Sequence, residues 1–414
     1  GCSGFSGNLY IGSGVTELGS SVFEDCSGFT FLSLSEGLTK ISGSFKNCSG
    51  FTGTLTIPGS VTELGSYAFQ GCSGFTGPLV IPEGVTKIGS DAFSGCFGFT
   101  SLSLPESLTE IWSGAFRNCT GLTGPLVLHE GLAMISNSAF GGCAGLTGPL
   151  TIPDSVTVME SGAFSGCAGF TSLSLGKGLA KLGDMAFENC TGLSGPLVLP
   201  EGLTSIGGSA FAYCTGLSDS LVLPESLTSI GSSAFEGCTG LTSLSSGGNL
   251  TYVGSAAFKG CTGLSGDLTL SGQGMSIGKG AFQDCTGLNG GIILTGVSSL
   301  GEYAFEGCTN LSGSLVLGDE LVSIDRYAFA GCTGLTGDLI LPDTVTEVGN
   351  YAFSGCTGFS GDLSIGSGII RVGTRAFENC SGFTGNLTIG GNGTEIEEKA
   401  FYRCTGFSGS LTLG

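Results

Sequence analysis

The chain has 414 residues, of which 40% are hydrophobic and only 11% are charged, and its net charge is −20. This acidity excludes a nucleic-acid-binding surface, which needs a basic stripe, and it disfavours docking on anionic lipid. No run of apolar residues approaches the length of about 18 that marks a membrane span, so we expect no membrane insertion in this segment.

A cysteine returns every 22 to 24 residues along the chain, and all 18 cysteines keep this phase. A period of this size, sustained over this length, is typical of a solenoid in which each repeat packs on its neighbours. We therefore predict a mainly β repeat solenoid, a right-handed array of about 17 turns with short parallel strands. We expect residues 1–414 to form a single continuous array without a linker, as a fragment of a longer array that lacks terminal caps.

The first strand of each turn occurs in two forms along the chain. The form Gly-Phe/Leu-Thr-Ser-Leu-Ser, followed by leucine in the first two copies, occurs at 98–104, 169–175 and 240–245, which are 71 residues apart, with a variant at 28–34. The turns between them contain Thr-Gly-Pro-Leu or a close relative, and the additional glycine makes most units 24 residues long. This recurrence indicates a superunit of three turns.

One unit, residues 120–143, illustrates the predicted local structure. Alternation at 126–128 predicts a short strand with two inward side chains, and the apolar pair at 132–135 predicts a second extended or tight-turn segment. Residues 139–143 predict a brief turn that closes on the cysteine. The apolar ring of this turn consists of Leu122, Leu126, Leu128, Leu132, Ile135, Ala139, Phe140 and Cys143.

Two further columns support a stacked core. A phenylalanine stands three residues before almost every cysteine, from Phe23 to Phe401, and predicts an internal aromatic ladder. For the cysteines themselves we favour buried thiols. Disulfides between some neighbouring cysteines remain an alternative. The turns lie about 4.8 Å apart, however, which exceeds the Cβ separation of about 3.8 Å that a disulfide prefers. With one histidine and no C-x-x-C pair, we predict no metal site and no cofactor.

The pattern L-x-L-P-x-x-L-T-x-I-G-x-x-A-F-x-x-C is clearest at 199–214 and 223–238. It resembles the BspA-like leucine-rich repeat family over essentially the whole chain. Proteins of this family are mostly secreted or displayed on the cell surface, and several serve adhesion. The resemblance implies a scaffold without catalytic residues, and the sequence offers no Ser/His/Asp or Cys/His arrangement of its own.

Two surface columns follow from the same phasing. Acidic residues follow the first strand and predict a solvated ridge: Glu36, Glu83, Glu106, Glu130, Asp154, Glu201, Glu225, Glu320 and Asp343. Small and β-branched residues occupy the outward strand position and predict a flat strip on the sheet face: Thr56, Val80, Ser103, Val127, Thr151, Ser174, Val198, Val222, Thr269, Val316, Ile340 and Thr388.

The clearest departure from the repeat lies near the C-terminal end. One phase holds Tyr303, Tyr327 and Tyr351 in three consecutive turns, followed by Arg375 and Lys399. Exposed tyrosine and arginine are favoured interface anchors, so these five residues are our candidate partner-binding site.

Asn-x-Ser/Thr sequons provide candidate glycosylation sites, and four of them have a cysteine in the middle position. The candidate asparagines are Asn47, Asn118, Asn189, Asn249, Asn310, Asn379, Asn386 and Asn392.

Together these patterns predict a non-enzymatic extracellular or cell-surface scaffold that mediates adhesion or protein–protein interaction through the solenoid surface, with the sheet face as the favoured side. Its expected partner is a protein or glycoprotein. The main alternative is a structural subunit of an extracellular fibre or filament, which would self-associate. A minor alternative is an ice-binding surface.

Overall fold

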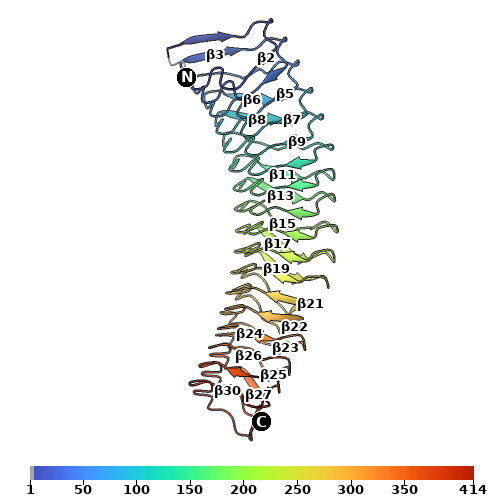
Figure 1. The fold of residues 1–414 in the computed structure, drawn as a ribbon, viewed down its shortest axis with the longest axis vertical. Helices are drawn as coiled ribbons and strands as arrows, with labels where there is room; N and C mark the ends of the chain where they lie inside the picture. The colour runs from blue at the N-terminus through green and yellow to red at the C-terminus, as the bar shows by residue number, and fades with distance from the viewer. Residues whose placement is uncertain (1–3) are drawn as a thin grey trace. The chain divides into compact units, whose positions relative to one another are not determined.

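In the computed structural model, which describes residues 4–414, the chain forms 31 short β-strands and no helix. The strands pair in parallel with strands of neighbouring turns, so the predicted β solenoid is confirmed. The contacts divide the chain into two compact units, one ending at Ser194 and one beginning at Gly195. Figure 1 shows the stacked coils of each unit. Residues 4–414 contain no helical segment of the length and apolarity needed to cross a bilayer.

The first unit carries two series of strands, one on each of two sides of the coil. The longer series contains β1 (Gly7–Tyr10), β3 (Phe29–Ser33), β6 (Gly77–Val80), β8 (Phe99–Ser103), β11 (Gly148–Thr151) and β13 (Phe170–Ser174). The two-residue series contains β2 (Glu17–Leu18), β4 (Lys40–Ile41), β5 (Glu63–Leu64), β7 (Lys87–Ile88), β9 (Glu110–Ile111), β10 (Met134–Ile135), β12 (Val158–Met159) and β14 (Lys181–Leu182).

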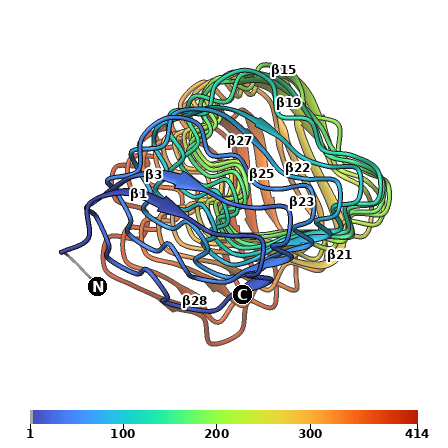
Figure 2. The same ribbon diagram turned by 90° about the horizontal axis from the view of Figure 1, so that it is seen from above.

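The second unit repeats this arrangement, and in two of its turns the two series merge into one long strand. The first series contains β15 (Gly195–Pro196), β17 (Leu217–Val222), β19 (Leu241–Ser245), β23 (Leu315–Leu317), β25 (Gly337–Leu341), β27 (Phe359–Ile365), β29 (Leu387–Ile389) and β31 (Leu411–Leu413). The merged strands are β21 (Leu268–Ile277) and β22 (Ile292–Leu300). The two-residue series contains β16 (Ser205–Ile206), β18 (Ser229–Ile230), β20 (Tyr252–Val253), β24 (Ser323–Ile324), β26 (Glu347–Val348), β28 (Arg371–Val372) and β30 (Glu395–Ile396). In Figure 2, β25 and β27 lie on a different side of the coil from β28.

The inserted glycine of the Thr-Gly-Pro-Leu turns sets a bulge at the start of the longer strands. Gly77 and Gly148 have φ angles of +82° and +81°, a left-handed conformation that glycine adopts without a steric penalty. The pairing register shifts directly after Gly77, which pairs with Phe99, whereas Pro78 pairs with Ser101. The insertion therefore lets a longer turn pair with a shorter one.

The phenylalanine ladder forms the centre of the core in both units. Consecutive rings stack with centroids 5.2 Å apart for Phe116 and Phe140, and 5.2 Å apart for Phe305 and Phe329. The second aromatic column meets this ladder edge to face, as Phe75 does with Phe69. The ladder is buried as predicted except at Phe23 and Phe401, which are half-buried.

Two predictions for the turn at 120–143 need correction. Residues 126–128 form no strand, because on this side of the coil the turn pairs with the next only through an isolated bridge between Gly124 and Leu146. Leu128 is consequently half-buried, while the other members of the predicted ring are buried. The second segment is confirmed as β10, and a turn precedes Cys143 as predicted.

The cysteine column lies beside the phenylalanine ladder, and its side chains are buried from Cys26 to Cys380. The thiol of Cys332 donates a hydrogen bond of 3.2 Å to the carbonyl oxygen of Phe305, one turn earlier. The backbone N–H of Cys308 donates to the same oxygen. Burial raises the pKa of Cys356 to about 12 and raises the pKa of Cys332 well above its ordinary value. The prediction of buried thiols is thus confirmed, and most of the thiols also donate to a carbonyl oxygen of the core, as Cys72 and Cys143 do.

Candidate functional site

The residue five positions before each cysteine has a left-handed backbone. The φ angles are +61° at Tyr303, +59° at Tyr327 and +58° at Tyr351, then +54° at Arg375 and +57° at Lys399. An L-residue pays about 1–2 kcal/mol for this conformation, which glycine adopts freely. The three tyrosines therefore occupy a position that the backbone itself would give to a smaller residue.

The three tyrosines form a stacked row on the surface of the second unit, which we call the tyrosine ladder. The rings of Tyr303 and Tyr327 stack with centroids 5.2 Å apart, and those of Tyr327 and Tyr351 are 4.8 Å apart and nearly parallel. All three are half-buried, because each covers part of the next. Burial of Tyr327 raises the pKa of its hydroxyl. The sequence analysis treated the tyrosines as exposed anchors, whereas in the structure the three rings form one continuous aromatic surface.

Cations lie against this row at several points. The Arg326 guanidinium is 5.6 Å from the ring centroid of Tyr303 and 5.5 Å from that of Tyr327, and it donates a 2.8 Å hydrogen bond to the Tyr303 hydroxyl. Lys279 lies 5.4 Å from the Tyr303 ring, and Arg375 lies 5.8 Å from the Tyr351 ring. Contacts of this kind stabilise by about 0.5–1 kcal/mol at exposed sites and fix the rings in place.

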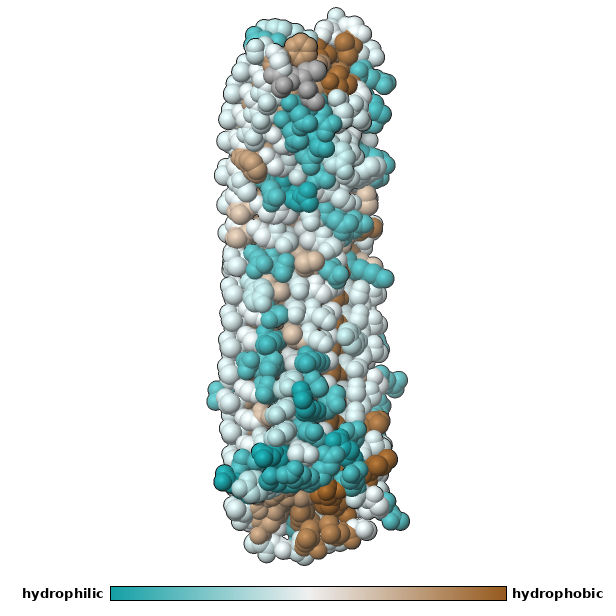
Figure 3. Space-filling model, turned by 60° about the vertical axis from the view of Figure 1, so that its left-hand side comes forward, coloured by the Kyte–Doolittle hydropathy of each residue, from teal (hydrophilic) through white to brown (hydrophobic). Residues whose placement is uncertain are grey.

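A carboxylate balances the cations at one end of the ladder. Glu302 accepts from Lys279 at 3.0 Å and lies 3.7 Å from Arg326. The hydrogen bond from Lys279 holds the pKa of Glu302 below its usual value. Figure 3 shows a broad hydrophilic patch toward the C-terminal end of this unit.

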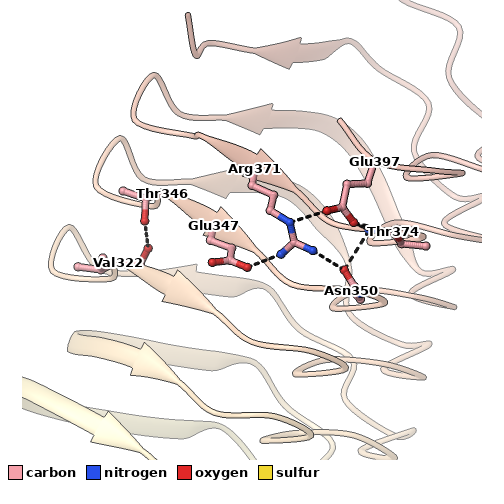
Figure 4. A network of polar contacts seen from close by, with 7 residues as sticks. All are labelled: Val322, Thr346, Glu347, Asn350, Arg371, Thr374 and Glu397. Atoms are coloured by element: carbon pink, nitrogen blue, oxygen red, sulfur yellow. Dashed lines mark hydrogen bonds and ion pairs between the residues drawn. The ribbon is translucent and has the colours of Figure 1, made fainter. Parts of the chain in front are cut away.

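A second polar cluster links the turns that carry Tyr351, Arg375 and Lys399, and Figure 4 shows its centre at Arg371. Arg371 in β28 donates from Nε to Glu397 at 2.6 Å and from Nη2 to Asn350 at 2.9 Å. It also donates to Glu347 of β26. One guanidinium thus ties three successive turns together.

Thr374 completes this cluster. Its backbone N–H donates to Asn350 at 3.1 Å and to Glu397 at 2.8 Å, and its hydroxyl donates to Glu397 at 2.8 Å. The hydrogen bonds from Arg371 and Thr374 lower the pKa of Glu397 to about 2. The cluster holds the turns on which Tyr351 and Arg375 stand.

The structure brings four of the five predicted site residues into one row, namely the tyrosine ladder and Arg375. Lys399 follows in the next turn at the same phase, where it is exposed and pairs with Glu398 at 2.5 Å. The sequence interpretation missed the roles of Lys279, Glu302, Asn350, Thr374 and Glu397. The sequence contains a signal that could have identified the first four. They occupy the phase directly before the left-handed position, and this preceding phase holds mostly serine in earlier turns but other polar or charged residues from Lys279 onward.

The acidic column has a structural role that the ridge interpretation did not include. Glu130 accepts hydrogen bonds from the backbone N–H groups of Asp154 and Ser155, both at 3.2 Å. Asp154 accepts from the backbone N–H of Lys177 at 2.9 Å. In the second unit, Asp343 accepts from the N–H of Ser367 at 2.6 Å, and this bond lowers its pKa. These exposed carboxylates therefore satisfy backbone donors of the following turn.

The outward strip on the longer strands is exposed as predicted in both units, for example at Val80, Val198 and Ile340. Thr388 is the exception, since it is half-buried. The strip is discontinuous in the first unit, because β6 pairs with β8 and β11 with β13 as separate two-stranded sheets.

The four sequons with a central cysteine have a backbone explanation. Asn47, Asn118, Asn189 and Asn379 directly precede a cysteine and have φ angles of +58° to +60°. Most other turns place glycine at this phase, and asparagine is among the residues that best tolerate the left-handed region. The remaining sequon asparagines include Asn249 and Asn310, whose amides donate to carbonyl oxygens of the preceding turn, and Asn386, whose amide contacts Asp362. Asn392 is exposed.

Among residues 4–414, no group of three or more His, Cys, Asp or Glu side chains is arranged to hold a metal ion.

Comparison with known families identifies the repeat. The model for the BspA type leucine rich repeat region matches residues 5–123, 77–194, 133–265, 195–312 and 275–408. The chain belongs to the BspA-type leucine-rich repeat family. Proteins built from leucine-rich repeats are typically protein-binding scaffolds, and the match indicates no catalytic family.

Several solved structures are similar to this chain. A leucine-rich repeat protein from Bacteroides ovatus is 25% identical, with 94% of this chain and 91% of that chain covered and a TM-score of 0.62. A leucine rich cell surface protein from Faecalibacterium prausnitzii is 26% identical over 85% of this chain and 83% of its own, with a TM-score of 0.41. The pneumococcal vaccine antigen PcpA is 18% identical over 81% of this chain and 84% of its own, with a TM-score of 0.45. No curated protein gives a significant match.

Proposed function

We propose that this chain is a non-catalytic scaffold, displayed on the cell surface or secreted, that binds a partner protein or glycoprotein and so mediates adhesion. Membership of the BspA-type family supports a binding scaffold. The uninterrupted family matches, including the one over 133–265, support residues 1–414 as one continuous array.

The tyrosine ladder is the observation that carries the binding proposal. Its side chains occupy a left-handed position where serine, alanine or glycine stands in preceding turns, at Ser233, Ala256 and Gly280. Tyr303, Tyr327 and Tyr351 are therefore not required by the backbone. Tyrosine combined with arginine is the composition that recurs at the energetic centre of protein interfaces. We accordingly place the partner surface on the ladder and Arg375, with Lys399 at its margin, in preference to the sheet face.

The ladder also has a low entropic cost of binding. Side chains that must be ordered on association cost about 0.5–1.5 kcal/mol each. Here the rings already stack on one another and on Arg326, and Arg375 already lies near Tyr351. Such a pre-ordered aromatic surface is suited to a stable protein contact.

Ice binding and fibre formation rank below protein binding. An ice-binding face needs a regular flat array, whereas the outward strip is divided between separate sheets in the first unit and mixes threonine, valine and serine irregularly. Fibre formation through self-association remains a prediction, and electron microscopy of the purified chain separates it from adhesion by the presence of long filaments. Mass spectrometry after expression in a secretory eukaryotic host tests the sequons.

The binding proposal is tested with immobilised extracellular matrix proteins as probes. Biolayer interferometry of the full chain against fibronectin, laminin, fibrinogen and collagen should detect at least one saturable interaction. The double variant Tyr327→Gly with Arg375→Gly should lose it, while Tyr252→Thr, which removes an exposed tyrosine elsewhere in the unit, should keep it. Full binding by the double variant would contradict the assignment of the site.

A further inference from the structure

A groove of 410 Å³ lies on the surface of the first unit, far along the chain from the tyrosine ladder. It is lined by Glu63, Tyr67, Lys87 and Trp112 around a floor of small residues that includes Gly65 and Gly89. Its volume falls within the range of about 300–1,000 Å³ that is usual for small-molecule sites. Trp112 is the only tryptophan of the chain.

The floor of the groove is open because the coils approach too closely for side chains there. A Cβ atom at Gly89 would lie 2.4 Å from the backbone carbon of Gly65, and one at Gly65 would lie 2.7 Å from the hydroxyl oxygen of Ser42. The absence of side chains at these two positions leaves a shallow trough across successive turns. Serine hydroxyls of Ser20, Ser42 and Ser66 line it.

Two aromatic side chains stand in this trough and remain partly exposed. Tyr67 is 42% exposed and Trp112 is 38% exposed. The indole N–H of Trp112 donates a 2.7 Å hydrogen bond to Glu110, which fixes the orientation of the ring. Lys46 lies 5.5 Å from the Tyr67 ring and so helps to hold it. The aromatic surfaces are therefore positioned in advance of any ligand.

The charges of the groove cancel. Glu63 pairs with Lys40 at 2.8 Å, and Lys87 pairs with Glu110 at 2.7 Å. In a chain of net charge −20, this local neutrality disfavours a strongly basic or acidic ligand. Leu64, the aliphatic member of the lining, is 1% exposed, so the aromatic rings of Tyr67 and Trp112 supply the large apolar surface of the groove.

We propose that this groove is a binding site for a neutral oligosaccharide. The apolar C–H faces of sugar rings match Tyr67 and Trp112, while sugar hydroxyls, which both donate and accept, match the serine hydroxyls, Glu63 and Lys87. The site goes beyond the protein-binding proposal and does not depend on it, because it uses other residues in the other unit.

Trp112 provides a direct assay, since its emission can be excited where tyrosine does not absorb. The full chain is titrated with neutral gluco-, galacto-, manno- and xylo-oligosaccharides, with a sulfated glycan, a sialylated glycan and a proline-rich peptide as comparators. At least one neutral oligosaccharide should shift the tryptophan emission in a saturable manner and release or absorb heat in calorimetry with the same Kd. The charged glycans and the peptide should not.

Three variants test the location. Trp112→Gly introduces the residue that the two preceding turns have at this phase, Gly65 and Gly89. It should weaken the affinity measured by calorimetry by at least about tenfold, while the melting temperature stays close to that of the parent. Tyr67→Ser retains the Trp112 reporter and should also weaken binding. Tyr252→Thr, and the ladder variant Tyr327→Gly with Arg375→Gly, should bind the oligosaccharide as the parent does.

Each opposite result overturns the proposal. No response to any neutral oligosaccharide would refute the ligand class. Unchanged affinity in a folded Trp112→Gly or Tyr67→Ser variant would refute the location. Tighter binding of a charged glycan or of the peptide would refute the argument from neutral charge.

Discussion

Replacing Tyr327 by glycine tests whether the tyrosine ladder contributes to stability as a surface feature or as part of the core. Tyr327 stacks on Tyr303 and Tyr351 and lies under Arg326, but only two residues later Phe329 is fully buried between Phe305 and Phe353. The two neighbouring positions therefore test surface packing and core packing in the same turn.

The expected loss at Tyr327 is small. Relief of the left-handed backbone gains about 1–2 kcal/mol, and the greater freedom of glycine in the unfolded chain cancels about 0.5–1 kcal/mol of that gain. The variant loses two half-exposed stacked pairs, each at the lower end of about 0.5–1.5 kcal/mol, and one cation–π contact of about 0.5–1 kcal/mol. Tyr327→Gly should therefore lower the free energy of unfolding by about 1 kcal/mol or less. Phe329→Ala should lower it by about 3–5 kcal/mol.

The measurement combines urea unfolding with hydrogen exchange of the turn that carries both residues. Exchange is needed because repeat proteins can unfold in stages, which makes a single global free energy ambiguous. A loss of more than about 3 kcal/mol for Tyr327→Gly, comparable with that of a buried phenylalanine, would refute the reasoning. The ladder would then belong to the core.

Three further predictions concern the cysteine column, the polar cluster around Arg371 and the sequons that contain a cysteine. A thiol reagent at neutral pH should label half-buried Cys404 well before Cys332, whose pKa is raised by burial, and urea should expose both. The pKa of Glu397 is about 2 when folded and about 4.3 when unfolded, so the stability it supplies is complete above pH 4.3 and is lost as the pH falls toward 2. Hydrogen exchange near 371–397 should accelerate over that interval. Asn118→Gly should leave the melting temperature nearly unchanged, whereas Asn118→Val should cost about 1–2 kcal/mol at its left-handed position.

Each of these predictions has a decisive opposite result. Rapid labelling of Cys332 in the native protein would contradict its burial. An acid dependence that persists in Arg371→Met would show that the Arg371–Glu397 pair is not its origin. Equal stability of the glycine and valine variants at Asn118 would contradict the backbone explanation of the cysteine-containing sequons.

The repeat, the core ladder and the two-residue strands could be predicted because each turn repeats the same apolar phase. Ile135 and Phe140, for example, lie where that phase requires. The missing strand at 126–128 could not be predicted, since strand pairing depends on the register between a longer and a shorter turn. Gly77 shows how one left-handed residue shifts that register.

A break in the repeat pattern located the candidate site, but the pattern did not predict the contacts within the site. The sequence placed Tyr303, Tyr327 and Tyr351 in one phase, and stacking follows from that phase. The contacts of Arg371 with Glu347 and Glu397 join residues 24 and 26 positions apart, so they depend on how side chains of three turns point in space. Single-turn patterns contain no such information.

The affinity of the triple variant Tyr303→Gly, Tyr327→Gly and Tyr351→Gly tests the central claim most directly. It is measured against whichever matrix protein binds the parent chain, with circular dichroism and melting to show that the solenoid is intact. Binding through the tyrosine ladder predicts a loss of at least about a hundredfold, because buried tyrosines at the centre of an interface contribute about 2 kcal/mol or more each. An intact triple variant that binds as tightly as the parent would contradict the claim.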